Sequence, residues 1–141
     1  MGDVRKPILI CESEPRNANV LSFVIETRRM FAVTKVGSAY DAIETMLQLP
    51  SMFYLVLTNQ LLKGSDGLEL TRRIKQLWPG QPVLIYSPCI SWTLPPDCLA
   101  DNSRIAFDLR HMLPMLEMID ILALRRRGPK PVPRPLTAAI A

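Results

Sequence analysis

Short apolar runs alternate with amphipathic stretches along the chain. Compact runs of aliphatic and branched side chains predict strands at residues 7–11, 31–36, 54–58, 82–87 and 104–107. Apolar positions that recur at helical spacing predict helices at residues 15–28, 38–50, 66–77 and 113–125. Strands that alternate with helices in this way predict an α/β fold, with a parallel sheet covered on both faces and ligand sites at the carboxyl ends of the strands.

The segment between the last two predicted strands interrupts this pattern. Pro88, Pro95 and Pro96 disfavour a regular helix, because proline lacks the backbone donor that helices need. No clean helix is expected there before about residues 97–102. We therefore expect the fourth helix to be irregular.

Composition divides the chain into a folded body and a basic tail. A chain of 141 residues with 48% hydrophobic and 21% charged residues fits one domain with a full core, which we place at residues 1–125. From Arg125 onward there are five basic residues and no acids, so the net charge of +4 belongs to the tail and the body is about neutral. Four prolines predict an extended, disordered tail or linker at residues 126–141. Nucleic acid is therefore not expected as a partner, except weakly through the tail.

Neither export nor metal binding by cysteines is indicated. No apolar run is long enough to cross a bilayer, and the short apolar stretch near the N-terminus is followed at once by acids, unlike a signal peptide. The three cysteines, Cys11, Cys89 and Cys98, lack paired metal-ligand spacing. We expect reduced thiols in a cytoplasmic protein without zinc, and Cys11 as inert packing in a buried strand.

Asn59 is the most informative polar residue. It ends the third apolar run and precedes a Gly-rich turn, Gly64-Ser65-Asp66-Gly67, at the start of a helix. A buried strand that stops at a polar side chain before such a turn aims that side chain into a cleft above the sheet. An aspartate there can act as a nucleophile or a metal ligand, whereas an asparagine keeps the shape without the charge. The plainer interpretation is a strand-end amide satisfied by N–H groups of the turn.

The ends of three strands together resemble the receiver domain of two-component response regulators, CheY-like proteins, across roughly residues 6–125. The first strand ends in Cys11-Glu12-Ser13, the third is followed by Asn59 and the turn that leads to Gly67-Leu68, and the fourth ends in Tyr86-Ser87. The resemblance implies a three-layer, doubly wound (βα)5 fold of the flavodoxin-like type, with a five-stranded parallel sheet in the order 2-1-3-4-5.

The family uses these strand ends for phosphoryl transfer. An acidic pair after the first strand holds Mg²⁺, an aspartate after the third accepts a phosphoryl group from a histidine kinase, a Thr or Ser after the fourth bonds the phosphoryl oxygens, and a Lys after the fifth pairs with them. Carried onto this chain, the acidic pair is Glu12 and Ser13, and the acceptor position is Asn59. The switch hydroxyl and the aromatic residue that move together on activation correspond to Ser87 and Phe107. The lysine has no clear counterpart, and Arg110 is the nearest cation.

These departures predict a site without its chemistry. Mg²⁺ prefers several hard oxygen ligands that include carboxylates, so Glu12 with neutral Ser13 and Asn59 predicts weak or absent Mg²⁺ binding and no other cofactor. Because phosphoryl transfer needs the metal and fixed cations, no catalytic residue and no enzyme activity are expected. Lys63, next to the site, can either replace the lost positive charge or be a solvated loop lysine, and the second interpretation is favoured. Glu12 itself can equally be a helix-capping acid, and Ser87 a structural hydroxyl.

A second set of residues predicts contacts with partners. Met112, Met115 and Met118 recur every three residues on the last predicted helix, which suits either core packing or an adaptable partner surface. We assign most of them to packing, and keep all three, with Trp92, as candidates for an interface. In the receiver family the face of the fourth helix, fifth strand and last helix docks partners or a second copy. His111, the single histidine, is expected at the surface or in a helix cap.

Three functions remain open from the sequence. The leading hypothesis is a phosphorylation-independent pseudo-receiver that regulates signalling by binding a signalling protein. The second keeps a phosphorylation switch, either through deamidation of Asn59 or through another acid. The third is the regulatory half of a two-component transcription factor whose effector domain is absent from this chain, with the proline-rich tail as its linker.

Overall fold

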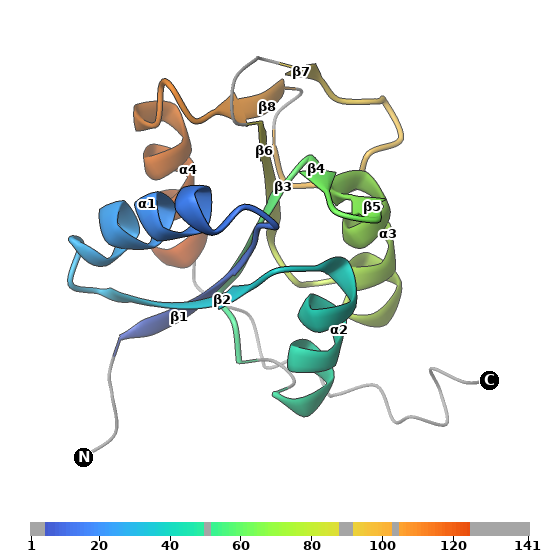
Figure 1. The fold of residues 1–141 in the computed structure, drawn as a ribbon, viewed down its shortest axis with the longest axis horizontal. Helices are drawn as coiled ribbons and strands as arrows, with labels where there is room; N and C mark the ends of the chain where they lie inside the picture. The colour runs from blue at the N-terminus through green and yellow to red at the C-terminus, as the bar shows by residue number, and fades with distance from the viewer. Residues whose placement is uncertain (1–4, 50–51, 88–91, 103–104, 125–141) are drawn as a thin grey trace.

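The computed structural model describes residues 5–49, 52–87, 92–102 and 105–124. Its main sheet has the strand order β2-β1-β3-β6-β8-β7 (Figure 1). The first five of these strands are parallel: β2 (Phe31–Val36), β1 (Lys6–Cys11), β3 (Leu55–Asn59), β6 (Val83–Ser87) and β8 (Ile105–Asp108). In chain order they run 2-1-3-4-5, which confirms the predicted fold class and topology.

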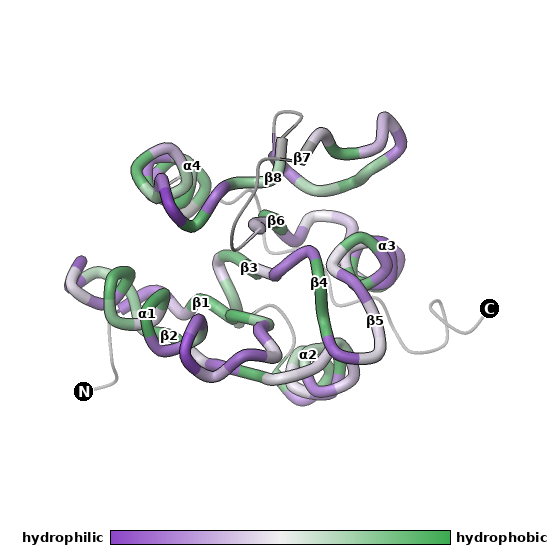
Figure 2. The backbone as a smooth tube through the Cα atoms, turned by 45° about the horizontal axis from the view of Figure 1, so that its top comes forward, coloured by the Kyte–Doolittle hydropathy of each residue, from purple (hydrophilic) through white to green (hydrophobic). Residues whose placement is uncertain are grey.

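Two pairs of helices cover the sheet. α1 (Pro15–Glu26) and α4 (Leu113–Leu124) pack on one face, through a core cluster that includes Leu21, Ile25, Met115 and Ile119. α2 (Ala39–Gln48) and α3 (Gly67–Leu77) pack on the other face, through a cluster of buried side chains from both helices: Ala42, Ile43, Met46, Leu70 and Ile74. Figure 2 shows this arrangement, with hydrophobic residues along the central strands β1 and β3. Both faces of those strands are buried, which explains why they appear in the sequence as continuous apolar runs.

Polar caps fix where the helices begin. The Ser38 hydroxyl accepts the backbone N–H of Asp41 at 3.0 Å before α2, and the Asp66 carboxylate accepts the N–H of Glu69 at 2.7 Å before α3. Pro15 occupies the first turn of α1, where a missing N–H has little effect. These caps agree with the predicted helix starts, because capping depends on residues only three positions apart.

The segment in place of the fourth helix is irregular, as predicted, but the helix expected at about residues 97–102 is absent. In the described part of the segment between β6 and β8, residues 92–102, no helix forms, and a short strand β7 (Trp92–Thr93) instead pairs antiparallel to β8. The residues after β7 cover the sheet as an irregular segment, with Leu94 buried against Ile85 and Ala106. Exposed Pro95 and Pro96 lie in this segment, consistent with the helix-breaking effect of proline.

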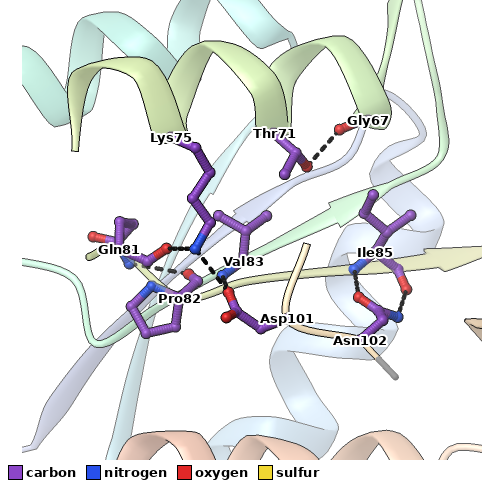
Figure 3. Close-up of polar contacts among 9 residues, drawn as sticks. All are labelled: Gly67, Thr71, Lys75, Gln81, Pro82, Val83, Ile85, Asp101 and Asn102. Atoms are coloured by element: carbon purple, nitrogen blue, oxygen red, sulfur yellow. Dashed lines mark hydrogen bonds and ion pairs between the residues drawn. The ribbon is translucent and has the colours of Figure 1, made fainter. Parts of the chain in front are cut away.

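Side chains hold this irregular segment against β6 (Figure 3). Asn102 accepts the N–H of Ile85 at 2.8 Å and donates to its carbonyl at 2.9 Å. Asp101 accepts the N–H of Val83 at 2.8 Å, and its backbone N–H donates to the Val83 carbonyl at 2.7 Å. Lys75 of α3 donates to the Asp101 carboxylate at 2.9 Å. These groups pair the edge of β6 where β8 does not reach, since β8 pairs with β6 only at Tyr86 and Ser87.

The predicted interface residues have different positions. Met115 is completely buried in the core, so its assignment to an interface was wrong and packing is its role. Met112 and Met118 are half-buried and pack against the same core. Trp92 of β7 pairs with Ala106 of β8, but its side chain is outside what the structure describes.

Cys89 and the tail at residues 126–141 also lie outside the described residues. None of the described helices is long and apolar enough to cross a membrane.

Candidate functional site

A tight hairpin follows Asn59 and fixes the loop above the end of β3. The short strands β4 (Leu61–Leu62) and β5 (Ser65–Asp66) pair antiparallel around Lys63 and Gly64, and Gly64 has a positive φ of 75°. Glycine adopts this conformation at no steric cost. Gly67 is required for a different reason, because an added Cβ would lie 2.5 Å from the carbonyl oxygen of Asn59. The turn predicted from the sequence therefore packs directly on the strand end.

Asn59 and Glu12 are joined side chain to side chain. The Asn59 amide nitrogen, Nδ2, donates to Oε1 of Glu12 at 2.9 Å, and its Oδ1 accepts the backbone N–H of Leu61 at 2.9 Å. Both side chains are buried. The sequence correctly placed these two strand ends together. The expected contact between the Asn59 side chain and an N–H of the turn is also present.

Tyr86 completes the environment of the Glu12 carboxylate. Its hydroxyl donates to Oε1 of Glu12 at 2.6 Å, and the backbone N–H of Glu14 donates to Oε2 at 2.9 Å. With the Asn59 amide, three protein donors bind this carboxylate. Buried carboxylates need such donors, because burial without hydrogen bonds is costly. Burial and the neighbouring Glu12 raise the pKa of Tyr86 far above its usual value, so its hydroxyl remains a donor.

Tyr86 was missed in the sequence because it ends an aliphatic run, where an aromatic side chain indicates core packing. It does pack in the core on the side of α1 and α4. The signal that identifies its polar role is the register, since Tyr86 lies opposite Asn59 in the β3–β6 pair. That register becomes known only once the strands are aligned.

Ser13 ties the first strand end to the hairpin. Its hydroxyl donates to the carbonyl of Gly37 and accepts the backbone N–H of Lys63, both at 2.9 Å. Lys63 thus contributes its backbone to the site, while the residue itself is exposed. This agrees with the interpretation of Lys63 as a solvated loop lysine.

The ends of β6 and β8 form the other half of this edge. Ser87 is buried and lies beside Asp108, while Phe107 is half-buried against the core. Arg110 binds the Asp108 carboxylate, with Nη2 at 2.8 Å from Oδ2 and the backbone N–H at 2.8 Å from Oδ1. These bonds lower the pKa of Asp108 to about 2, so the carboxylate stays charged and balances the guanidinium. His111 is exposed just before α4, as predicted.

Cys11 lies next to Glu12 but has no free reactive form at neutral pH. It is fully buried, and burial raises the pKa of its thiol to about 12. A thiol is nucleophilic only as the thiolate. The prediction that Cys11 packs in a buried strand is confirmed.

The comparison with family models decides the family. The model of the response regulator receiver domain matches residues 8–91, which is more than half of the chain. The chain belongs to the response regulator receiver family. The matched region ends before β7, and so includes Glu12, Asn59 and Tyr86 but not the irregular segment at residues 92–102.

Solved receiver structures share the fold. The response regulator TrrA from Thermotoga maritima, solved in complex with Mg(2+)-BeF, matches with a TM-score of 0.71 and 16% identity over 83% of this chain and 98% of that chain. The HemR receiver domain from Leptospira biflexa, in its non-phosphorylated form, matches with a TM-score of 0.71 and 17% identity, over 89% of this chain and 99% of that one.

A sensor protein from Polaromonas sp. JS666 is more similar in sequence, with 27% identity and a TM-score of 0.54 over 60% of this chain. The match covers 66% of that chain, slightly less than two thirds of its length. None of the curated proteins matches the sequence.

Proposed function

We propose that this receiver domain is a pseudo-receiver, a regulatory module that acts by binding other proteins and does not cycle through aspartyl phosphate. The observation that carries the proposal is the bond from the Asn59 amide to the Glu12 carboxylate, 2.9 Å long. Where the family has an acceptor aspartate beside metal-binding acids, this chain has an amide donor that satisfies a carboxylate. The two side chains complement each other, which supports an abandoned phosphorylation site rather than a single lesion in a working one.

The residues at this position do not suit Mg²⁺, which requires several oxygen ligands in near-octahedral geometry. Both oxygens of Glu12 already accept hydrogen bonds from the protein. Oδ1 of Asn59 accepts an N–H, and Ser13 is neutral and bonded to two backbone groups. Coordination of a metal by these atoms would break bonds inside the domain without adding a second carboxylate. We therefore infer weak or absent Mg²⁺ binding and no need for a cofactor.

Arg110, the cation nearest to the position of the missing lysine, is already paired. The guanidinium of Arg110 is committed to Asp108, and their charges offset each other at the end of β8. Developing negative charge on a phosphoryl group needs fixed cations or a metal nearby. This supports a module without enzyme activity, in which Ser87 has a structural role.

Such a module signals by binding partners on its outer surface. The last helix carries Leu113, which is 63% exposed, and Ile121, which is 56% exposed. Exposed apolar side chains on a helix of an otherwise well-packed domain suit contact with another protein. We infer that a signalling protein docks on α4, and that a second copy of the chain competes for the same face. A cytoplasmic location fits this role.

Mass spectrometry tests the proposal. The full chain is incubated with Mg²⁺ and acetyl phosphate beside a receiver that retains its aspartate, and intact masses are recorded. We expect an adduct on the positive control and none on this protein. A stoichiometric phosphoryl adduct that disappears in Asn59→Ala would sink the proposal. Peptide mapping of untreated protein at residue 59 tests the deamidation alternative, which requires Asp in a substantial fraction of the molecules.

A further inference from the structure

A groove separates α3 from the irregular segment that replaces the fourth helix. Figure 1 shows this segment running from β7 back toward α3. The groove has a volume of about 320 Å³, and its apolar lining comes from Leu68 on α3 and from Pro95 and Leu99 on the segment. Leu99 is 52% exposed. The groove is outside the cluster around Asn59 and plays no part in the proposed loss of phosphorylation.

The polar lining of the groove is mainly acidic. Asp66, Glu69 and Asp97 contribute three carboxylates against one guanidinium, that of Arg72. Arg72 is already paired with Glu69 at 2.6 Å, so these two charges offset each other. Asp66 accepts a backbone N–H as the cap of α3, and Asp97 is exposed. An occupant of this groove should therefore combine apolar surface with positive charge.

One segment of this chain has that chemistry. Residues 125–141 contain five basic residues, no acids, and prolines at positions 129, 131, 133 and 135. Proline-rich segments favour the extended polyproline conformation, in which residues three apart share a side at a spacing of roughly 9 Å. Arg127, Lys130 and Pro133 are spaced in this way. Such a segment presents cations and proline rings together, and its low conformational entropy reduces the cost of docking.

The segment is also long enough. It follows Leu124 at the end of α4 and has seventeen residues, which in the polyproline conformation span roughly 50 Å at about 3.1 Å per residue. A folded body of about 120 residues has a radius of gyration near 14 Å, and hence a diameter of roughly 35 Å. The segment can therefore reach the groove of its own chain, even though α4 and α3 cover opposite faces of the sheet.

We propose that the basic, proline-rich segment at residues 125–141 docks in cis into the groove between α3 and residues 95–99. The docked segment covers Cys98 and Leu99 and places its cations beside Asp66 and Asp97.

Carbodiimide cross-linking tests the contact directly, because Lys130 is the only lysine in the segment. We expect Lys130 to couple to Asp97 or Asp66 in monomers of the full chain, and the yield to fall in about 0.5 M salt, where surface charges are screened. The yield should also fall in a variant carrying Asp66→Asn and Asp97→Asn, in which asparagine still caps α3. Asp41→Asn on α2, an exposed acid away from the groove, is the matched control and should leave the yield unchanged.

Alkylation of Cys98 gives an independent readout, resolved from Cys89 by fragment masses. If the tail occupies the groove four-fifths of the time, charge reversal by Arg127→Glu, Lys130→Glu and Arg134→Glu should speed alkylation about fivefold. The same reversal on the body, at exposed Arg16, Arg29 and Lys35, should not change the rate. Equal rates in both variants would overturn the proposal. So would cross-links found only in dimers of mixed isotopic label, which would assign the groove to a second copy of the chain.

Discussion

At the scale of single residues, the site consists of a buried carboxylate and the donors that satisfy it. Glu12 accepts hydrogen bonds from the Asn59 amide, the Tyr86 hydroxyl and the N–H of Glu14. Each donor comes from a different point of the sequence, so the arrangement depends on the sheet register. The resemblance of the strand ends to those of receiver domains predicted that Glu12 and Asn59 meet, at the carboxyl ends of neighbouring parallel strands. It did not predict Tyr86, whose side-chain hydroxyl acts within an apolar strand.

Asn59→Asp tests whether this site still tolerates an acid. The substitution places a second carboxylate within hydrogen-bond distance of Glu12 and removes a donor from it, so at neutral pH we expect a loss of about 2–4 kcal/mol in the free energy of unfolding. Urea unfolding followed by circular dichroism measures this loss. Asn19→Asp is the matched control, because Asn19 is exposed and accepts a bond from Lys35, and it should not destabilise. Equal stability of Asn59→Asp and the natural protein would contradict the donor role of the amide.

Tyr86→Phe tests the hydrogen bond from the Tyr86 hydroxyl to the Glu12 carboxylate. It removes only the hydroxyl, which leaves a buried carboxylate with one donor fewer and should cost about 1.5–3 kcal/mol. Tyr40→Phe provides the comparison, since the Tyr40 hydroxyl donates to Glu44 at 3.1 Å on the exposed face of α2. That variant should lose less than about 0.5 kcal/mol. If the two variants have the same unfolding midpoint in urea, the buried hydrogen bond from Tyr86 stabilises the domain no more than the exposed one from Tyr40.

At the scale of elements, local sequence patterns predicted the strands and most helices. They did not predict the structure of the connection between β6 and β8. The parallel strands and the four helices are close to the predicted ranges because both faces of the sheet and one face of each helix are apolar. The segment after β6 depends instead on contacts between residues far apart, above all those of Asp101 and Asn102 with the edge of β6. Side chains that substitute for a neighbouring strand have no periodic pattern, so the sequence showed only that prolines exclude a regular helix.

Asn102→Ala should detach this segment from the sheet edge. Asn102 is buried and binds both backbone groups of Ile85, which would remain unpaired in the variant, at an expected cost of about 2–4 kcal/mol. Hydrogen exchange of the Ile85 amide should accelerate in parallel, which locates the effect. Asn19→Ala, at an exposed position on α1, should change stability by less than about 0.5 kcal/mol. Unchanged protection of the Ile85 amide in Asn102→Ala would show that the segment is held by other contacts.

The end of β8 gives a pH-dependent test. Arg110 lowers the pKa of Asp108 from 3.8 to about 2, so the pair stabilises the folded state above pH 3.8 and loses that effect as the pH falls through 2. In Arg110→Gln the midpoint of the Asp108 carboxyl titration, followed by carbon NMR, should rise toward the ordinary value. The decrease in the free energy of unfolding between those two pH values should also become smaller. Arg29→Gln, at an exposed cation elsewhere, should leave the midpoint of Asp108 in place.

At the scale of the whole molecule, the receiver fold is retained while the polar residues at the carboxyl edge of the sheet bind one another. Glu12, Ser13 and Asn59 are all bonded to protein groups, and Arg110 is neutralised by Asp108. A domain in this state carries its own stabilising contacts where a metal would otherwise contribute binding energy. Its stability should therefore be independent of the divalent cation that the family uses.

Thermal unfolding with and without Mg²⁺ measures this independence. If Mg²⁺ bound with a dissociation constant of about 1 mM, about 10 mM of the ion would add about 1.4 kcal/mol and raise the midpoint by roughly 5 °C. We expect no rise beyond that given by NaCl at matched ionic strength, because coordination would have to displace the Asn59 and Tyr86 donors from Glu12. A rise specific to Mg²⁺ that disappears in Glu12→Gln would show that the carboxylate still binds the metal.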